Sequence, residues 1–332
     1  MCFYRYAADV QATKPEVLLV EEAGEILESH IITSLAPETK QMILIGDHQQ
    51  LRPKVSNYDL SVEKGDGYDL NMSTFERLVK KGYPHCTLIQ QHRMRPEIST
   101  LVRHLTYPDL VDAGSTKTRP DLRGFSDNVI FVNHDHPEEE DNRIKDRREL
   151  TSSSKRNLYE AEMVLKTVRY LAQQGYGSDE IVVLTPYLGQ LRLLQEILAQ
   201  ENDPILNDLD ASDLSHAGLL GTVAVASSKK RSVHISTIGR LIIPYKSFLF
   251  LSNFLQDNYQ GEEKDIVVVS MTRCNQSKDI GFMSAPQRLN VLLSRARNAM
   301  ILFGSVDTFK NARKGKDTYT KLFEHLNGAG HL

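Results

Sequence analysis

Two short apolar runs near the start of the chain, each followed by acidic or amide side chains, limit its possible folds more than any other feature. The runs are Val17–Val20, followed by Glu21 and Glu22, and Met42–Ile45, followed by Gly46, Asp47 and Gln50. Short apolar runs bounded by polar turns are typical of strands buried on both faces of a parallel sheet. The apolar spacing over residues 26–35 predicts a helix between them.

Ligands of parallel sheets bind at the carboxyl ends of the strands, and the acidic residues would lie at such an edge. A carboxylate there can hold Mg²⁺, usually through water, and a second can orient an attacking water molecule. Either run taken alone fits two core strands with ordinary solvated loops equally well, because short apolar runs are ambiguous. The rest of the chain has to decide between these interpretations.

Strands and helices alternate along the remaining chain. We expect strands at residues 86–89, 129–133, 180–184, 233–238, 265–270 and 300–303, and helices at 74–81 (capped by Ser73), 96–105, 157–174, about 190–200, 286–297 and 319–327. Such alternation predicts an α/β fold with parallel sheets and right-handed connections. Two sheets, divided near Gln91, fit a length of 332 residues. The charged and Ser-rich segment 137–154 predicts a solvated, mobile loop.

Composition excludes several classes of protein. The formal net charge of −3 gives no overall basic character, so any contact with nucleic acid needs a local patch. Cys2, Cys86 and Cys274 are too scattered for a zinc cluster or a disulfide framework, which fits the cytoplasm or the nucleus. No apolar run approaches the roughly 18 residues of a membrane helix, and the first residues lack the layout of a signal peptide. We therefore expect no membrane partner.

Four polar stretches carry candidate chemistry. They are Gln91–Arg93, Thr185–Gln190, Tyr259–Asp265 and Arg288–Arg297. A helix over 286–297 would place Arg288 and Arg295 two turns apart on one face. An arginine there can bind a phosphate through two hydrogen bonds and neutralise charge during phosphoryl transfer. For any one arginine, a solvated or salt-bridged side chain fits as well, so the order and spacing of the stretches carry the evidence.

That order and spacing resemble motifs II to VI of superfamily 1 helicases. The matching segments are Glu-Glu-Ala at 21–23, Gly-Asp-x-x-Gln-Leu-x-Pro at 46–53, Gln-His-Arg-Met-x-Pro at 91–96, Thr-Pro-Tyr-x-Gly-Gln at 185–190, Tyr-Gln-Gly-Glu-Glu-x-Asp at 259–265 and Leu-Ser-Arg-Ala-Arg at 293–297. The resemblance is strongest to the Upf-like subgroup, and within it to the NFX-type zinc-finger helicases linked to RNA silencing. It extends from about residue 16 to about residue 310.

The resemblance implies a RecA-like P-loop NTPase fold with parallel sheets. Residues 1–90 would form the C-terminal half of a first RecA-like domain, and residues 91–332 a complete second one. The implied function is that of an ATP-dependent RNA or DNA helicase, which couples ATP hydrolysis to movement on a single strand. Its implied cofactors are ATP and Mg²⁺, and its implied partners are single-stranded RNA or DNA and the RNA-silencing machinery.

The resemblance also implies a role for individual residues. For catalysis these are Glu22, which would polarise the attacking water, Gln50, which would sense the γ-phosphate, and Arg93 and Arg295, which would grip it. For nucleotide binding they are Glu21 (with Mg²⁺ through water), Gly46, Asp47, His92 (stacking on adenine), Gly261, Glu263 and Arg297. For nucleic-acid binding they are Thr185, Pro186, Tyr187, Gln190, Ser236 and Thr237.

The chain departs from the family in one absence. It contains no Gly-x-x-x-x-Gly-Lys-[Ser/Thr], the loop whose amides and lysine cradle the β- and γ-phosphates. We therefore expect this polypeptide alone to bind ATP weakly and to hydrolyse it negligibly. Two other functions fit the same sequence: a catalytically inactive helicase-like module that binds RNA or protein, and an inert product of a misread gene that never folds stably.

The second departure is an insertion. Residues 239–256 form an apolar 18-residue segment between two motifs that relatives join directly. An exposed apolar run of this kind favours aggregation. One hypothesis is a retained intron, because removal restores an uninterrupted motif. The other is a genuine loop that packs its apolar face on the second domain.

Overall fold

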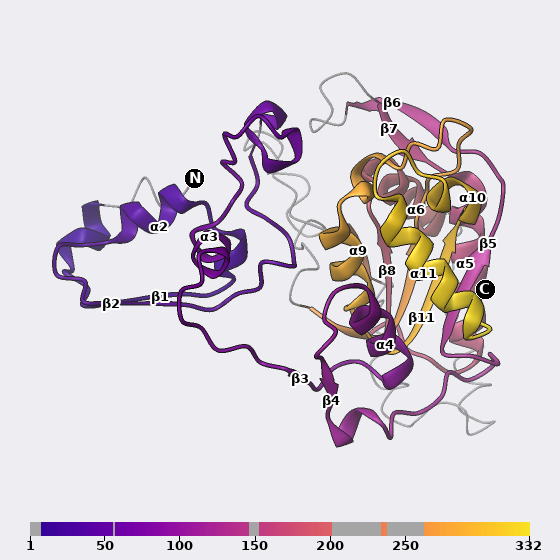
Figure 1. Cartoon of the computed structure of the whole chain (residues 1–332). Coiled ribbons are helices and arrows are strands. Elements are labelled where there is room, and N and C mark those ends of the chain that lie inside the picture. The colour runs from indigo at the N-terminus through magenta and orange to yellow at the C-terminus, as the bar shows by residue number, and fades with distance from the viewer. Residues whose placement is uncertain (1–7, 56, 146–152, 201–233, 238–261) are drawn as a thin grey trace. The chain divides into compact units, whose positions relative to one another are not determined.

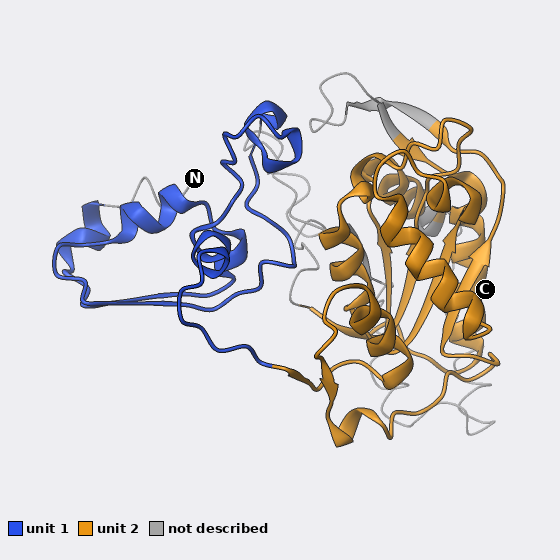
Figure 2. Ribbon diagram, in the orientation of Figure 1, with its two compact units in different colours: residues 1–88 blue, residues 89–332 orange. Residues whose placement is uncertain are grey.

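The chain divides into two compact units. The computed structural model describes residues 8–55, 57–145, 153–200, 234–237 and 262–332. The first unit is Met1–Leu88 and the second is Ile89–Leu332 (Figure 2). The insertion at 239–256 and Gly261 lie outside the described residues.

The first unit is built on the two apolar runs. Strands β1 (Val17–Val20) and β2 (Gln41–Leu44) pair in parallel, with Leu18 opposite Met42, and helix α2 (Glu28–Ser34) lies between them in the chain. The same unit also contains the 3-10 turns η1 (Ala23–Glu25), η2 (Tyr58–Leu60) and η3 (Val62–Lys64) and helix α3 (Thr74–Lys80), which Figure 1 labels. The predicted parallel pair with a connecting helix is therefore confirmed.

The prediction that these strands are buried on both faces is wrong. Leu19 is 60% exposed, Ile45 54% and Val17 52%. An apolar run is enough to predict a strand, but burial on both faces also needs a layer of helices on each side. The first unit has two paired strands, and the part of it that the structure describes leaves these side chains accessible.

The second unit contains a five-stranded parallel sheet in the order β5-β11-β10-β8-β9. The strands are β5 (Val129–Asn133), β8 (Ile181–Thr185), β9 (His234–Thr237), β10 (Lys264–Ser270) and β11 (Ala296–Gly304). Each neighbouring pair runs parallel. This confirms the predicted α/β class with parallel sheets.

Helices cover both faces of this sheet (Figure 1). Helices α5 (Leu158–Gln173) and α6 (Leu188–Gln200) pack on one face of the sheet. The side chains of that face include Ile181 and Val183 of β8 and Ile266 and Val268 of β10. The opposite side chains of these strands, such as Val182 and Val267, are also fully buried. The other α-helices in the described part of this unit are α4 (Pro96–Leu105), α9 (Pro286–Leu293), α10 (Val306–Lys310) and α11 (Lys316–Gly328). Strands buried on both faces are therefore found in the second unit.

Local capping agrees with the sequence at two helices. The Ser73 hydroxyl accepts the backbone N–H of Glu76 at 3.0 Å, which satisfies one of the amides left open at the start of α3. Pro96 occupies the first turn of α4, where a missing N–H costs nothing.

Three local predictions are corrected. The strand expected at 86–89 lies at Gln90–Gln91 (β3), where it pairs with β4 (Val111–Asp112). Part of the expected mobile loop 137–154 forms a hairpin of β6 (Glu139–Lys145) and β7 (Ser153–Arg156), while residues 146–152 lie outside the description. Charged residues are compatible with such a hairpin because the strands satisfy each other's backbone groups.

The third correction concerns the helix expected over 286–297. Helix α9 ends at Leu293. The Ser294 N–H donates to the Asn290 carbonyl and makes the last hydrogen bond of the helix. Arg295 lies in the connection, and Arg297 lies on β11. Arg288 and Arg295 therefore do not share a helix face.

The packing of α5 on the sheet predicts that replacing two leucines of that helix by alanine lowers the free energy of unfolding by unequal amounts. Leu171 is fully buried and Leu158 is 46% exposed. Leu171→Ala should lower the free energy of unfolding by about 3 kcal/mol, since it leaves a cavity beside the sheet, and Leu158→Ala by about 0.5 kcal/mol or less. Urea unfolding followed by circular dichroism measures both. Equal losses would contradict this packing.

Candidate nucleotide and nucleic-acid site

The ends of β1 and β2 are joined by close backbone contacts. The Ala23 N–H donates to the Ile45 carbonyl at 2.8 Å, directly after the two strands end. A Cβ on Gly46 would lie 2.8 Å from the Gly24 nitrogen, and one on Gly24 would lie 2.5 Å from the Asp47 carbonyl oxygen. Both positions therefore require glycine, and the acidic residues after the two strands lie at one edge.

This edge presents oxygen ligands of the kind that Mg²⁺ prefers. Glu21 and Glu22 are exposed, and Glu22 has the left-handed backbone conformation (φ 51°). The Asp47 carboxylate accepts the Gln49 N–H at 2.8 Å and lies 3.5 Å from the Gln50 amide nitrogen. Among the described residues, no three or more acidic, histidine or cysteine side chains form a ready metal cluster. These carboxylates fit a metal that is held mainly by nucleotide phosphates and water.

Arg52 fixes the 46–53 segment to helix α3. Its Nε and Nη2 donate to the two oxygens of Glu76 at 3.0 and 2.7 Å, and Glu76 is 1% exposed. Burial would raise the pKa of Glu76, but hydrogen bonds from Arg52 and Lys80 lower it below its ordinary value. Sequence reasoning missed this pair, because the partners lie 24 positions apart and no spacing rule connects them.

In the second unit, Gln91 holds the turn that carries His92 and Arg93. Its side-chain oxygen accepts the N–H groups of Arg93 and Met94 at 2.9 and 2.7 Å, and its amide donates to Asp112 at 2.7 Å. The His92 side chain is exposed. Gln91 therefore acts on the backbone, and His92 and Arg93 are the residues that the turn presents.

Arg93 and Arg295 meet at the C-terminal end of α9. Arg93 donates to the Ser294 carbonyl at 2.9 Å. Arg295, which is 2% exposed, donates to the Val291 carbonyl at 2.8 Å and to the Ser294 hydroxyl at 3.2 Å. The last carbonyls of a helix have no partner within the helix and attract cations. Arg93 and Arg295 are thus held by the end of one helix, although they come from distant parts of the sequence.

Glu263 and Asp265 complete this cluster. Glu263 pairs with Arg93 at 2.5 Å, and Arg297 lies 3.6 Å from Glu263 and 3.5 Å from Asp265. The structure therefore brings together Arg93, Arg295, Arg297 and Glu263, four of the residues implicated in catalysis or nucleotide binding. Gly261 belongs to the same motif but lies outside the described residues.

Arg119 is a fourth arginine of this region, and the sequence did not indicate it. It donates to the His92 carbonyl at 3.2 Å and to the Asn298 side-chain oxygen at 3.3 Å. Burial lowers its pKa, and the positive charge of Arg297 lowers it further. Its segment has no regular pattern, so only the tertiary structure reveals it. Four arginines beside two carboxylates leave an excess of positive charge that suits a polyphosphate.

The residues predicted to contact nucleic acid after β8 are buried. Thr185 and Gln190 are 0% exposed and Tyr187 is 4% exposed, and Pro186 is also buried. Tyr187 donates to the Ile280 carbonyl at 2.7 Å, and burial raises its pKa to about 12. In this structure these side chains anchor the segment, and nucleic-acid contact by them stays a prediction.

Gln190 shows the anchoring most clearly. Its amide oxygen accepts the Asn157 N–H at 2.7 Å, and its amide nitrogen donates to the Ser270 hydroxyl at 2.9 Å. Ser236 and Thr237 end the neighbouring strand β9, where Thr237 pairs with Thr185. The carboxyl ends of β8 and β9 therefore lie side by side.

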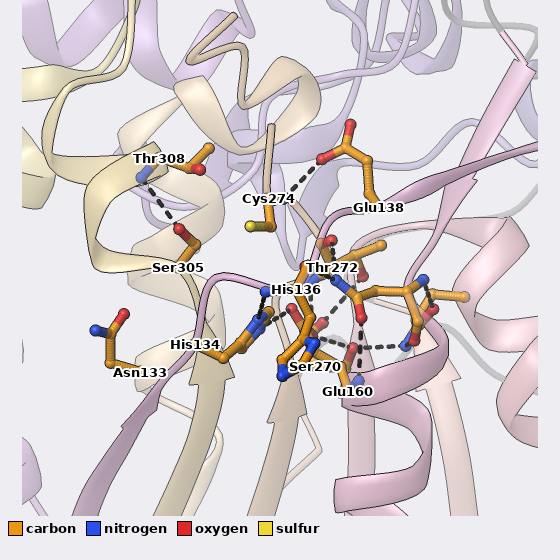
Figure 3. Close-up of polar contacts among 12 residues, drawn as sticks. Asn133, His134, His136, Glu138, Glu160, Ser270, Thr272, Cys274, Ser305 and Thr308 are labelled. Carbon is orange, nitrogen blue, oxygen red and sulfur yellow. Dashed lines mark hydrogen bonds and ion pairs between the residues drawn. The ribbon is translucent and has the colours of Figure 1, made fainter. Parts of the chain in front are cut away.

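The buried carboxyl group of Glu160 connects the ends of strands in the five-stranded sheet (Figure 3). Glu160 accepts from the Ser270 hydroxyl at 2.5 Å and the Thr272 N–H at 2.8 Å, and lies 2.9 Å from His134 Nε2. Asn157 caps α5 by accepting the Glu160 N–H at 3.1 Å. Sequence reasoning missed this network, although an Asn three residues before a Glu at a helix start is a recognisable cap signature.

Comparison with known proteins identifies the family to which the chain belongs. Two family models, both described as AAA domains, match residues 6–57 and 70–307. The second covers the arginine cluster and the carboxyl edge of the five-stranded sheet. This chain belongs to the Upf-like group of the superfamily 1 helicase family. Its similarity to such helicases extends over nine-tenths of its length.

Three relatives illustrate the similarity of this chain to the family. It is 34% identical over 91% of its length to NFX1-type zinc finger-containing protein 1 of Mus musculus, of which it covers 13%. It is 31% identical over 91% of its length to helicase required for RNAi-mediated heterochromatin assembly 1 of Schizosaccharomyces pombe, covering 25%. It is 27% identical over 88% to ATP-dependent helicase NAM7 of Saccharomyces cerevisiae, covering 26%. The chain thus spans about a quarter or less of each.

The helicase domain shows no membrane-crossing element in its described part. None of the helices there combines the length with the apolar character that a bilayer crossing requires.

The Arg52–Glu76 pair predicts a strong dependence of the first unit on Arg52. Arg52→Ala should lower the free energy of unfolding by about 3 kcal/mol, because it leaves a buried carboxylate without its main partner. Arg192→Ala, which removes an exposed pair with Glu196, is the matched control and should cost about 0.5 kcal/mol or less. Urea unfolding of the variants measures the difference. An equal cost would show that the buried pair adds nothing.

The same pair predicts acid sensitivity. The pKa of Glu76 lies below its ordinary 4.5, so its contribution to stability is fully present above pH 4.5 and is lost as pH falls through the folded-state pKa. The stability difference between wild type and Arg52→Ala should therefore shrink on acidification from about pH 7 to about pH 3. Urea midpoints across this range measure it, and a constant difference would contradict the assignment.

Proposed function

We propose that this chain carries the second nucleotide-contacting half and the strand-binding edge of an ATP-dependent helicase that moves on single-stranded RNA or DNA. The strand-binding edge is the carboxyl ends of β8 and β9, and the strand that it would bind is the nucleic acid. The observation that carries the proposal is the meeting of Arg93 and Arg295 at the end of α9. Two guanidinium groups fixed at one point, with Glu263 beside them, suit the binding of a phosphate chain.

The arginines have a clear chemical task in phosphoryl transfer. Negative charge spreads over the transferring phosphoryl group, and arginines placed beside it lower the barrier. Arg295 is buried and held by main-chain oxygens, so little reorganisation is needed when the charge develops. Arg93 is paired with Glu263 and would exchange that partner for phosphate.

The first unit carries its own candidate groups. Glu22 would orient the attacking water, Gln50 would respond to the γ-phosphate, and Glu21 and Asp47 would hold the hydrated metal. When bound, Mg²⁺ supplies neutralisation of phosphate charge. Gly24 and Gly46 keep this edge narrow, because a side chain at either would collide with the opposite loop.

Single-stranded nucleic acid is the proposed substrate. The carboxyl ends of β8 and β9, where Thr185 pairs with Thr237, would form part of the path. Contacts to the sugar–phosphate backbone together with a few stacked bases give little sequence preference. No motif distinguishes RNA from DNA, because 2′-hydroxyl contacts come from scattered residues. The names of the relatives, which include RNAi-mediated heterochromatin assembly, support an RNA-silencing or RNA-surveillance role in the nucleus or cytoplasm.

A second candidate function is a helicase-like binding module without turnover. The observation that favours it is the absence of Gly-x-x-x-x-Gly-Lys-[Ser/Thr] from these 332 residues. Without that loop the β- and γ-phosphates lack their main backbone donors. The two functions differ in whether a phosphate-binding loop is joined to this chain, and they share the same strand-binding edge.

The test separates the two functions. We expect the 332-residue chain alone to bind a single strand and to hydrolyse ATP at background rate. Fusion of the loop-containing half-domain of a relative should restore RNA-stimulated ATP turnover. Arg295→Lys in that fusion should reduce the turnover about a thousandfold, because lysine cannot donate the two parallel hydrogen bonds of a guanidinium group. Phosphate release measures turnover.

Arg313→Ala, at an exposed arginine, is the control and should keep full activity. Thermal melts of both variants verify folding. Turnover that survives Arg295→Lys would overturn the catalytic assignment. A fusion that folds and binds RNA yet never hydrolyses ATP would favour the binding module.

A further inference from the structure

An aromatic pair lies just beyond the carboxyl end of β5. The rings of His136 and Tyr159 are stacked, with centroids 3.8 Å apart and planes 20° apart. His136 is exposed and Tyr159 is partly buried. The pair therefore has a buried side that fixes it and an accessible side.

The backbone of His136 is held at both of its polar groups. Its N–H donates to His134 Nδ1 at 3.2 Å, and its carbonyl accepts from the Asn157 amide at 3.0 Å. Because His134 Nδ1 accepts a hydrogen bond, its proton is on Nε2, which faces Glu160 at 2.9 Å. The ring of His136 is thus positioned by the buried Glu160 network (Figure 3).

The pair lies at the same edge as the proposed strand-binding path. Strands β5, β11, β10 and β8 are neighbours in the sheet and all run parallel, so the pair and Thr185 both follow carboxyl ends. The carboxyl ends of β5 and β8 are three strand spacings apart, which is a distance of about 14 Å across the sheet. A bound single strand of several nucleotides can extend across that distance.

Two acidic residues near the pair, Glu138 and Glu139, form ion pairs with arginines. Glu138 is 2.9 Å from Arg273, and both side chains are buried. Glu139 is 3.0 Å from Arg156. These ion pairs reduce the repulsion that a phosphate backbone would meet at this edge.

We propose that the His136–Tyr159 pair is a stacking platform for one unpaired base of the single strand. The inference rests on the proposed function, because it places a base on the same strand-binding edge. An exposed ring that is fixed by its backbone and by a second ring loses little freedom when a base stacks on it. Every base has a π-face, so such a platform binds without sequence preference.

The test uses the 332-residue chain and two fluorescein-labelled probes. One is an oligouridylate of about 12 nucleotides, and the other is an abasic strand of equal length that keeps every phosphate. We expect His136→Ala to weaken oligouridylate binding about five- to hundredfold, measured by fluorescence anisotropy, and His136→Tyr to restore it. Binding of the abasic strand should be the same in wild type and His136→Ala.

The matched control is His104→Ala. His104 is also exposed and stacks on another ring, that of His325, with centroids 5.3 Å apart. It lies on α4, and its replacement should leave both affinities unchanged. The control separates loss of a stacking platform from the general effect of removing a surface imidazole.

The outcomes are distinguishable. If wild type binds oligouridylate and His136→Ala binds it equally well, the platform is refuted and the proposed function stands. An equal loss on the abasic strand would also refute it, because the contact would then be to phosphate or sugar. If wild type binds neither probe, the strand-binding function fails, and the platform fails with it.

Discussion

The second unit depends on the satisfaction of one buried carboxyl group. Glu160 is 0% exposed and takes hydrogen bonds from Ser270 and Thr272 at the end of β10, with His134 from the end of β5 against its other oxygen. A buried polar group without partners costs several kcal/mol, so these three groups have to converge on it. These contacts fix the positions of the strand ends. The loops that follow the strands therefore start from fixed positions.

A second constraint acts through the arginines. The chain has a small negative net charge, yet Arg93, Arg119, Arg295 and Arg297 gather around Glu263 and Asp265. Carbonyl groups at the end of α9 hold two of the guanidinium groups, which keeps them together despite their mutual repulsion. Local chemistry of this kind supports the proposal that a protein without overall basic character binds phosphates at this point.

Much of the architecture was predictable from sequence, because strands and helices follow from local apolar patterns. The strands at 129–133 and 265–270 and the caps of α3 and α4 appear as expected. The helix at 286–297 was wrong, because its apolar pattern runs on into β11 and periodicity does not show where a helix ends. The accessible strands β1 and β2 were also misjudged, because burial depends on neighbouring layers and not on the run itself.

The sequence by itself determined the order of the elements, the motifs of the helicase family and the residue types at each strand end. Only the tertiary structure decided which of those side chains are accessible. It buries Gln190 against Asn157, leaves the ring of His136 exposed, and recruits Arg52 and Arg119 to positions that no motif marks. The reason is physical. Hydrogen bonds and burial join groups far apart in the chain, such as Arg93 and Ser294, which are 201 positions apart, whereas sequence patterns report only on near neighbours.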